Sequence, residues 1–225
     1  MTNDQTGTYM PRIMDDAPDF EAKTTHGTVR LSDYTTKGKW VMLFSHPADF
    51  TPVCSTEFLA FARRNQEFEK RNVQLIGLSI DSLFSHIAWA RDIEQRSGVS
   101  ITFPVIADLD QKVARLYGMV HEAVSDTATV RAVFLIDPKR KIRAILYYPM
   151  QLGRNVDELL RMFDGLQTAD LNSVSTPADW KPGDPVIVPA PATLEAARKR
   201  ANGEDQGLHV EAWYLSTKAS KSTSN

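Results

Sequence analysis

The sequence predicts an α/β sandwich built on a mixed β-sheet, and three observations lead to this fold class. Apolar runs typical of buried strands alternate with helical patterns through the first half of the chain. Two further apolar runs follow each other across a short charged turn, as in a hairpin, and an amphipathic helix comes after them. Alternation of strands and helices favours parallel strands, whereas a hairpin is antiparallel. We therefore expect a mixed sheet flanked by helices.

The individual elements follow from apolar periodicity and from turn residues. Residues 1–12 are polar and expected to be loosely ordered. Thr51 and Pro52 mark the start of the first long helix, and Gly118 ends a short one. The first expected elements are a hairpin or edge strand at 20–28 and a turn or helical cap at 31–34. A strand at 40–44 is followed by a helix that ends near residue 70, and a strand at 73–79 is followed by a helix that ends near residue 96. The remaining elements are an apolar segment at 103–107, a brief helix at 113–117, paired strands at 130–136 and 142–148, and a helix at 155–167.

The chain beyond residue 167 has a different composition, with repeated prolines and few large aliphatic residues. A short strand at 185–188 and a charged helix at 193–202 are expected there, and 216–225 is expected to fray. The apolar residues of this part are too few to build a core alone.

We therefore divide the chain into a first domain at 1–168 and a small C-terminal domain at 169–225. The second domain either wraps the first or lies on a partner subunit. In either case Trp180, Trp213 and Tyr214 are expected to be its packing anchors.

Composition limits the classes of function. The chain has 225 residues, 42% of them hydrophobic, which is enough for one domain with an appendage. Its net charge of −2, with both signs interspersed, provides no basic surface for nucleic acid or for an anionic membrane. No apolar run approaches the roughly 20 residues that span a bilayer, and the polar start does not resemble a secretory signal. We expect a soluble, cytoplasmic protein that binds neither nucleic acid nor membrane.

The single cysteine, Cys54, lies where a predicted strand gives way to a helix. With Thr51 as N-cap and Pro52 as the first helical residue, Cys54 takes the third helical position. Unpaired backbone N–H groups and the helix dipole stabilise an anion there, and therefore a thiolate. A lone cysteine is more often a small buried hydrophobe. The strand–loop–helix context and the spacing of Pro47, Thr51 and Cys54 favour a reactive thiol instead.

The loop around the cysteine reads Ser45-His46-Pro47-Ala48-Asp49-Phe50-Thr51-Pro52-Val53-Cys54. It resembles the peroxidatic-cysteine loop of peroxiredoxins, the AhpC/TSA family, and looks like their one-cysteine (Prx6-type) branch. The resemblance covers roughly residues 10–216 and includes the segments Leu78–Ser82, His86-x-x-Trp89, Val133–Pro138 and Gly153–Glu158. It implies a thioredoxin-like fold with a small C-terminal domain packed on a partner subunit in a homodimer. It also implies an antioxidant enzyme, a thiol peroxidase.

Reduction of a peroxide by a thiol needs an ionised sulfur and donors for the charge that spreads over both oxygens. Arg131 opens an otherwise apolar strand and is the best cation for this task, although a strand-end arginine can simply reach solvent. The resemblance places the family's catalytic arginine at Arg131. It also directs the hydroxyl of Thr51, which could otherwise only cap the helix, toward the sulfur and the peroxide. Pro47, which lacks an N–H, shapes and shields the same loop.

Three further residues are expected to support the site. Glu57 lies one turn beyond Cys54 and can hold Arg131 and Arg154 through charge-assisted hydrogen bonds, or else be an exposed helix carboxylate. His46 matches a histidine of the one-cysteine branch, where it can meet the recycling chemistry or the oxidised sulfur; a lone loop histidine is more often structural. The other histidines form no metal-ligand spacing with each other or with the cysteine, so we expect no metal and no cofactor.

A single cysteine also determines the later steps. Attack on hydrogen peroxide or an alkyl hydroperoxide leaves Cys54 as a sulfenic acid, and no second cysteine is present to resolve it. An external thiol reductant is therefore expected, acting on a homodimer or a ring of such dimers. Two other functions share the nucleophile. One is a redox-regulated chaperone or peroxide sensor, and the other is a hydrolase using Cys54 and His46, for which the sequence shows no acyl pocket.

Overall fold

The computed structural model describes residues 10–220, and the chain divides into two compact units between Val156 and Asp157. This division falls at the start of helix α5 (Val156–Asn172), ahead of the domain border expected at residue 168. The expected border remains a prediction.

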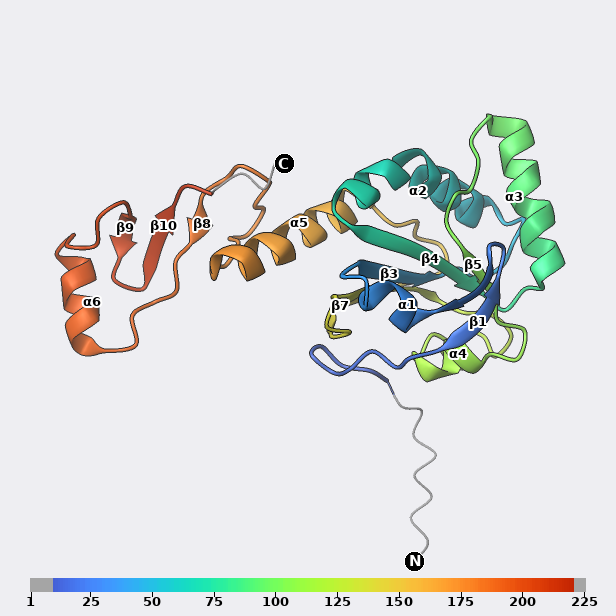
Figure 1. The fold of residues 1–225 in the computed structure, drawn as a ribbon, viewed down its shortest axis with the longest axis horizontal. Helices are drawn as coiled ribbons and strands as arrows, with labels where there is room; N and C mark the ends of the chain where they lie inside the picture. Colours follow the sequence, from blue (N-terminus) through green and yellow to red (C-terminus); the bar gives the residue numbers. More distant parts are fainter. Residues whose placement is uncertain (1–9, 221–225) are drawn as a thin grey trace, which may run out of the picture. The chain divides into compact units, whose positions relative to one another are not determined.

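The first unit is built on a seven-stranded sheet of order β2-β1-β5-β4-β3-β6-β7 (Figure 1). Its strands are β1 (Glu21–Thr24), β2 (Gly27–Arg30), β3 (Trp40–Ser45), β4 (Val73–Ser79), β5 (Val105–Ala107), β6 (Arg131–Ile136) and β7 (Ile142–Tyr148). Strands β3, β4 and β5 are parallel, whereas β6 is antiparallel to both β3 and β7. The predicted mixed sheet and its closing hairpin are confirmed.

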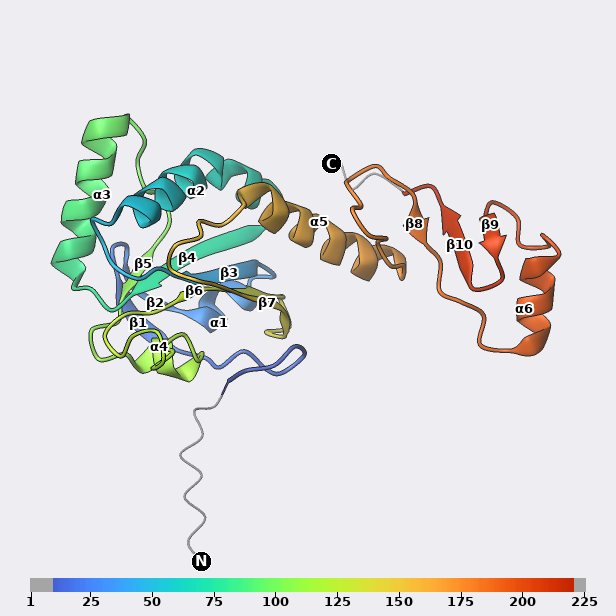
Figure 2. The same cartoon turned by 180° about the vertical axis from the view of Figure 1, so that it is seen from behind.

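The helices of the first unit cover both faces of this sheet. Helices α2 (Pro52–Lys70) and α3 (Leu83–Ser97) lie on one face, and α1 (Leu31–Thr35) and α4 (Lys112–Leu116) lie on the other (Figures 1 and 2). Strands β3, β4 and β5 follow one another in one direction across the sheet. Right-handed crossovers then place both connecting helices, α2 and α3, on the same face.

The ends of the two long helices follow local sequence signals. Helix α2 begins as predicted, with Thr51 extended at the N-cap and Pro52 as the first helical residue. Helix α3 is capped by the Ser82 hydroxyl, which accepts the N–H of Ser85 at 3.1 Å, and it ends at Gly98 with a left-handed φ of 70°. Among helices within the described residues, none is long and apolar enough to cross a membrane.

The core between α2 and the sheet is aromatic. Phe58 of α2 packs against Phe44 and Phe103, each with ring centroids 5.6 Å away, and Phe61 lies 4.7 Å from Phe44. All four rings are buried, as is Cys54 on the same helix. This packing holds α2 against β3 and β4 and so fixes the height of its first turn above the sheet.

The second unit carries a small antiparallel sheet of order β8-β10-β9, together with helix α6. The bounds are β8 (Val186–Ile187), α6 (Leu194–Ala201), β9 (His209–Ala212) and β10 (Leu215–Lys218). Two sequence predictions are wrong here. Helix α5 continues past residue 167, and β10 occupies part of the segment expected to fray because its backbone pairs with both β8 and β9. The end of that segment, from residue 221, lies outside the described residues.

Trp180 is the packing anchor of the second unit. It is buried with Val174 and Val186, and its Nε1 donates to the Asp184 carbonyl at 3.1 Å. The other two expected anchors, Trp213 and Tyr214, are 47% and 59% exposed in this chain. Their packing on a partner subunit remains a prediction.

Candidate active site

Cys54 lies at the carboxyl end of β3, at the third position of α2, and its side chain is fully buried. Pro47 and Thr51 belong to the loop that joins these two elements. Thr51 is the N-cap residue of α2 as predicted, but its hydroxyl donates to the carbonyl of Ala48 at 2.8 Å and makes no capping hydrogen bond, which rules out the alternative role of this side chain as a cap. The first-turn N–H groups are therefore left uncovered by Thr51 and can stabilise an anion.

Strand β6 brings a cation to this point. Its register pairs Phe44 with Val133, so that Arg131, its first residue, lies beside the end of β3. Arg131 Nη1 lies 3.3 Å from the Sγ of Cys54, although 77 positions separate the two in sequence. Its Nε and Nη2 both donate to the carbonyl of Met150, at 3.0 and 2.8 Å, which fixes the plane of the guanidinium. Arg131 is only 2% exposed, so it is not a strand-end arginine that reaches solvent.

Glu57 binds two arginines at once. Its Oε2 accepts from Arg131 Nη1 at 2.7 Å and from Arg154 Nη2 at 2.6 Å. Its Oε1 accepts from the Nε and the backbone N–H of Arg154, both at 2.8 Å. The Nη1 of Arg154 donates to the carbonyls of Ser45 and Ala132, at 3.0 and 3.2 Å. Glu57 is 4% exposed, which excludes the alternative of a solvent-facing carboxylate.

The buried charges of this cluster sum to one positive charge. Burial alone would raise the pKa of Glu57, but the charge and hydrogen bonds of Arg154, together with the charge of Arg131, hold that pKa below its ordinary value. Glu57 is therefore ionised, and with two arginines it leaves one net positive charge beside Cys54. A thiolate neutralises this charge, whereas a neutral thiol leaves it uncompensated in a buried site. The cluster can therefore stabilise negative charge that develops at the sulfur during a reaction.

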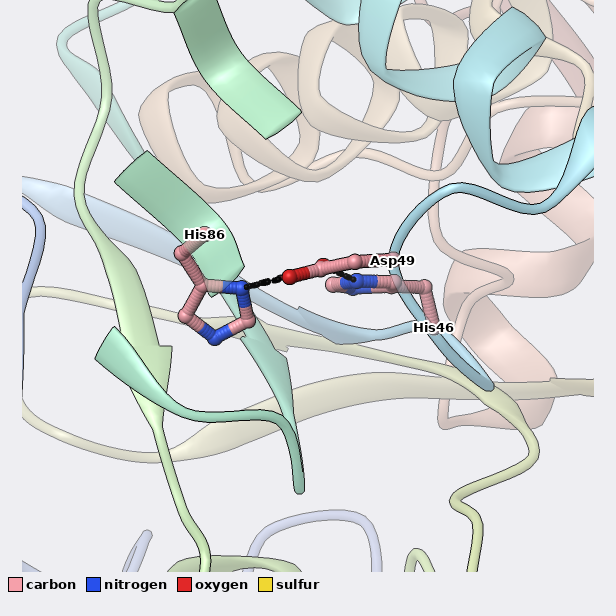
Figure 3. Close-up of side chains that lie close together, drawn as sticks. All are labelled: His46, Asp49 and His86. Carbon is pink, nitrogen blue, oxygen red and sulfur yellow. Dashed lines mark hydrogen bonds and ion pairs between the residues drawn. The ribbon is translucent and has the colours of Figure 1, made fainter. Parts of the chain in front are cut away.

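A second buried cluster lies in and next to the cysteine loop and contains His46, Asp49 and His86 (Figure 3). Asp49 Oδ1 lies 3.0 Å from His46 Nε2, and Asp49 Oδ2 lies 2.8 Å from His86 Nδ1. Burial lowers the pKa of His46 by more than the hydrogen bond and charge of Asp49 raise it, so His46 is neutral. With Nε2 donating to Asp49, Nδ1 of His46 is a buried acceptor without a hydrogen-bond partner among the described residues.

The same three residues have the composition and spacing to hold a metal ion, since their ligand atoms lie within 4.8 Å of one another. They are the one such group within residues 10–220. Sequence spacing missed this cluster because 37 positions separate Asp49 from His86. The atoms that would bind a metal already bond to one another, and the Nε2 of His86 lies 3.1 Å from the carbonyl of Ile106. The hydrogen bonds among these residues, and the one to Ile106, therefore account for their positions without an ion.

Two family comparisons cover both units of the chain. The AhpC/TSA family matches residues 13–145, and the C-terminal domain of 1-Cys peroxiredoxin matches residues 165–203. The chain belongs to the peroxiredoxin family. A peroxiredoxin of Aquifex aeolicus is 53% identical over 219 residues, which cover 93% of this chain and 97% of that relative.

Solved peroxiredoxin structures share the fold. The yeast mitochondrial 1-Cys peroxiredoxin is 44% identical with a TM-score of 0.82, over 94% of this chain and all of that one. A cysteine-to-serine variant of the peroxiredoxin 6 of Arenicola marina is 36% identical with a TM-score of 0.83, over 94% of this chain and 99% of that one. The expected thioredoxin-like fold with a small C-terminal part is confirmed. As a peroxiredoxin with one cysteine, the chain is a thiol peroxidase that takes a peroxide as substrate and a thiol as reductant.

The structure gathers most of the predicted site residues in one place. Cys54, Arg131, Glu57 and Arg154 form a continuous set of contacts, and Thr51 and Pro47 lie in the adjoining loop. His46 instead hydrogen-bonds to Asp49, and Asp49 in turn bonds to His86. Asp49 and His86 were not expected in the site. Sequence reasoning also missed the Met150 carbonyl, because a backbone acceptor has no signature in residue type.

Proposed function

We propose that this peroxiredoxin reduces hydrogen peroxide and organic hydroperoxides through the thiolate of Cys54. The observation that carries the proposal is the guanidinium of Arg131, 3.3 Å from Sγ in a buried cluster of net positive charge. The thiolate attacks one peroxide oxygen, forming an S–O bond as the O–O bond breaks. The second oxygen leaves as hydroxide or alkoxide and takes up a proton from water. Sulfur is oxidised by two electrons to a sulfenic acid, and the peroxide is reduced.

Each neighbour of the sulfur has a distinct part in this step. Arg131 stabilises the charge that spreads over the two oxygens, and its fixed plane means that little reorganisation is needed. Glu57 and Arg154 hold Arg131 in place. Thr51, whose hydroxyl oxygen retains acceptor capacity, aligns the peroxide, and Pro47 shields the loop from water.

His46 has a separate role in the proposal. Its neutral ring leaves a buried Nδ1 acceptor without a partner among the described residues. We assign that acceptor to the S–OH group of oxidised Cys54, a donor that the reduced enzyme lacks.

The sulfenic acid is reduced by an external thiol. One thiol displaces water to form a mixed disulfide with Cys54, and a second thiol releases the enzyme thiol and a small disulfide. Structural work on the yeast mitochondrial relative concerns thiol resolution by glutathione and thioredoxin systems, so both thiols are the first to test here. A cycle that depends on external thiols fits a reducing compartment, and we place the enzyme in the cytoplasm.

The enzyme is further proposed to act as a homodimer, with the C-terminal part packed on the partner subunit. Trp213 and Tyr214, which are largely exposed in one chain, supply apolar surface for that contact. Light scattering from the purified protein should give the mass of two chains or an even multiple of it. The mass of one chain at micromolar concentration would contradict this part.

Mass spectrometry of Cys54 tests the function directly. One equivalent of hydrogen peroxide should add one oxygen to Cys54, and glutathione or a reduced thioredoxin should remove it with continued peroxide consumption. A Cys54→Ser variant is the control and should consume no peroxide. Oxidised protein that changes its assembly but that no thiol reduces would favour the sensor or chaperone function instead.

A further inference from the structure

The loop at residues 46–51 leads into α2. Backbone groups of His46 bond to Leu78 and Thr129 at the start of this loop, and Asp49 anchors its middle. The Asp49 carboxylate accepts from the hydroxyl of Ser85 at 2.8 Å, from His86 Nδ1 at 2.8 Å and from His46 Nε2 at 3.0 Å. Its backbone N–H donates to Asp81 Oδ2 at 3.1 Å. Ser85 and His86 belong to α3, so one buried side chain joins the cysteine loop to that helix (Figure 3).

His86 is held from both sides. Its Nδ1 faces the Asp49 carboxylate, and its Nε2 lies 3.1 Å from the carbonyl of Ile106 in β5. Both ring nitrogens therefore face an oxygen atom, one on the cysteine loop and one on β5. The side chains of His86 and Asp49 are 0% and 1% exposed, so the hydrogen bond between them is fully buried. A hydrogen bond is directional, and loss of the donor leaves a buried carboxylate oxygen without this partner.

The residue after Asp49 explains why the loop needs an anchor. Phe50 has a φ of 56°, in the left-handed region that residues with a Cβ avoid. Such a conformation persists only where the surroundings enforce it. The Phe50 side chain is 57% exposed, so its own packing supplies little of this restraint. The neighbours on both sides are held in place, Asp49 by its hydrogen bonds and Thr51 by its position at the start of α2, and they can supply this restraint.

We propose that Asp49 and His86 are positioning residues of the peroxide step. Their buried pair holds the cysteine loop in the conformation that places Thr51 and the first turn of α2, and therefore Cys54, opposite Arg131. They act through the loop and not on the peroxide. The inference rests on the proposed function, because it assigns these residues to the alignment that this reaction requires.

Two substitutions of His86 separate its contact with Asp49 from its packing. In His86→Asn the amide nitrogen takes the place of Nδ1 and still donates to Asp49, whereas in His86→Gln it takes the place of Nε2 and donates to Ile106 instead. We expect His86→Gln and Asp49→Asn to slow the single-turnover reaction with hydrogen peroxide by about tenfold to a hundredfold, the effect of a shift of about 1 Å in a reacting group. His86→Asn should stay close to the wild type. Asp92→Asn, which removes a more exposed carboxylate of the same helix, is the matched control.

A second reaction of the same sulfur makes the test specific. Alkylation of Cys54 by iodoacetamide needs a thiolate but no alignment with Arg131 and Thr51. We therefore expect the variants to lose more of the peroxide rate than of the alkylation rate. The proposal would be overturned if His86→Asn and His86→Gln lost the same fraction of the peroxide rate, or if Asp49→Asn kept the full peroxide rate. It would also be overturned if the variants lost the peroxide rate and the alkylation rate to the same extent. If His86→Gln does not fold, Ser85→Ala replaces it and should give a smaller loss in the same direction.

Two further controls distinguish this proposal from other failures. A wild type that does not react with peroxide at Cys54 would defeat the proposed function itself, whereas a reactive wild type with unaffected variants defeats only the positioning role. The cluster also contains residue types that can bind a metal, and treatment with a chelator tests whether one is needed. If the hydrogen-bonded pair does the positioning, chelator-treated wild type should keep its full peroxide rate. Loss of that rate on chelation, with recovery on addition of zinc alone, would show that a metal and not the hydrogen-bonded pair does the positioning.

Discussion

Glu57 is the residue that makes the two buried arginines compatible with one sulfur. Arg131 and Arg154 both donate to its carboxylate, so its charge decides whether the cluster carries one net positive charge or two. Replacement by glutamine leaves two buried cations with a neutral amide. The loss of one partner of a buried ion pair costs about 3–5 kcal/mol.

We therefore predict that Glu57→Gln lowers the free energy of unfolding at neutral pH by about 3–5 kcal/mol. The folded-state pKa of Glu57 lies below its ordinary value of 4.5, because the arginines outweigh the effect of burial. The stability that this carboxylate contributes is therefore complete above pH 4.5 and is lost as pH falls through the lower folded-state value. Urea unfolding over a pH series should show the gap between wild type and variant narrowing in acid. A gap independent of pH would contradict this assignment.

The hydroxyl group of Thr51 has two functions that substitutions can distinguish. Its bond to the carbonyl of Ala48 shapes the loop, and its oxygen remains an acceptor for a peroxide proton. Thr51→Ser keeps the hydroxyl and should retain most of the peroxide rate. Thr51→Val keeps the shape but should react about a hundredfold more slowly, the usual effect of removing one aligned group. Equal single-turnover rates for the two variants would remove Thr51 from the reaction.

At the scale of elements, the position of α2 depends on how closely Phe58 approaches β4. A Cβ added at Gly77 would lie 3.2 Å from Phe58 Cζ and 3.4 Å from Phe44 Cζ. Phe58 also packs on Trp89, with ring centroids 4.6 Å apart, and has little room to move. The absence of a side chain at this position of the strand therefore lets α2 lie close to the sheet.

We predict that Gly77→Ala destabilises the protein by about 1–3 kcal/mol, the usual effect of overpacking a core. Gly165→Ala, in helix α5, is the control, because its new Cβ would meet nothing closer than 3.6 Å and alanine favours a helix. Thermal unfolding of the two variants should show melting temperatures that shift in opposite directions or by clearly unequal amounts relative to wild type. A Gly77→Ala variant as stable as the wild type would show that the aromatic core can adjust.

Elements with local signals could be predicted from the sequence, and long-range contacts could not. The start of α2 was readable because Thr51 and Pro52 are a local helix signal, and β3 because it is a continuous apolar run. The approach of Arg131 to Cys54 depends on the antiparallel register of β6 against β3, and resemblance to a family supplied it, not periodicity. The Asp49–His86 contact joins a loop to a distant helix, and no spacing rule predicts such a pair.

At the scale of the whole molecule, the short strands β9 and β10 were missed because they are only four residues long and largely polar. Their place in the sheet comes from backbone pairing, which gives no strong apolar pattern. The burial of Trp180 was predictable, because a large aromatic side chain in a segment with few apolar residues is expected to form the centre of a small hydrophobic core. Trp180 is buried as expected.

The whole chain contains one sulfur nucleophile, and this determines how the enzyme fails under excess oxidant. Without an external thiol, oxidised Cys54 cannot be protected as an intrachain disulfide, so further peroxide should carry it to sulfinic acid. We predict that activity lost after several equivalents of peroxide is not recovered by a thiol, whereas activity lost after one equivalent is. Mass spectra should show two added oxygens in the first case and one in the second. Full recovery in both cases would contradict this prediction.

The decisive measurement for the role of the buried guanidinium is the single-turnover rate at which hydrogen peroxide oxidises the Arg131→Ala variant. We predict that this rate falls by about a hundredfold to a thousandfold relative to wild type, because a preorganised donor beside the sulfur is removed. Arg131→Lys should recover only part of the rate, since an ammonium group cannot contact the sulfur, Glu57 and the Met150 carbonyl in the same geometry. A folded Arg131→Ala variant that reacts as fast as wild type would show that this guanidinium does not promote the attack of Cys54 on the peroxide.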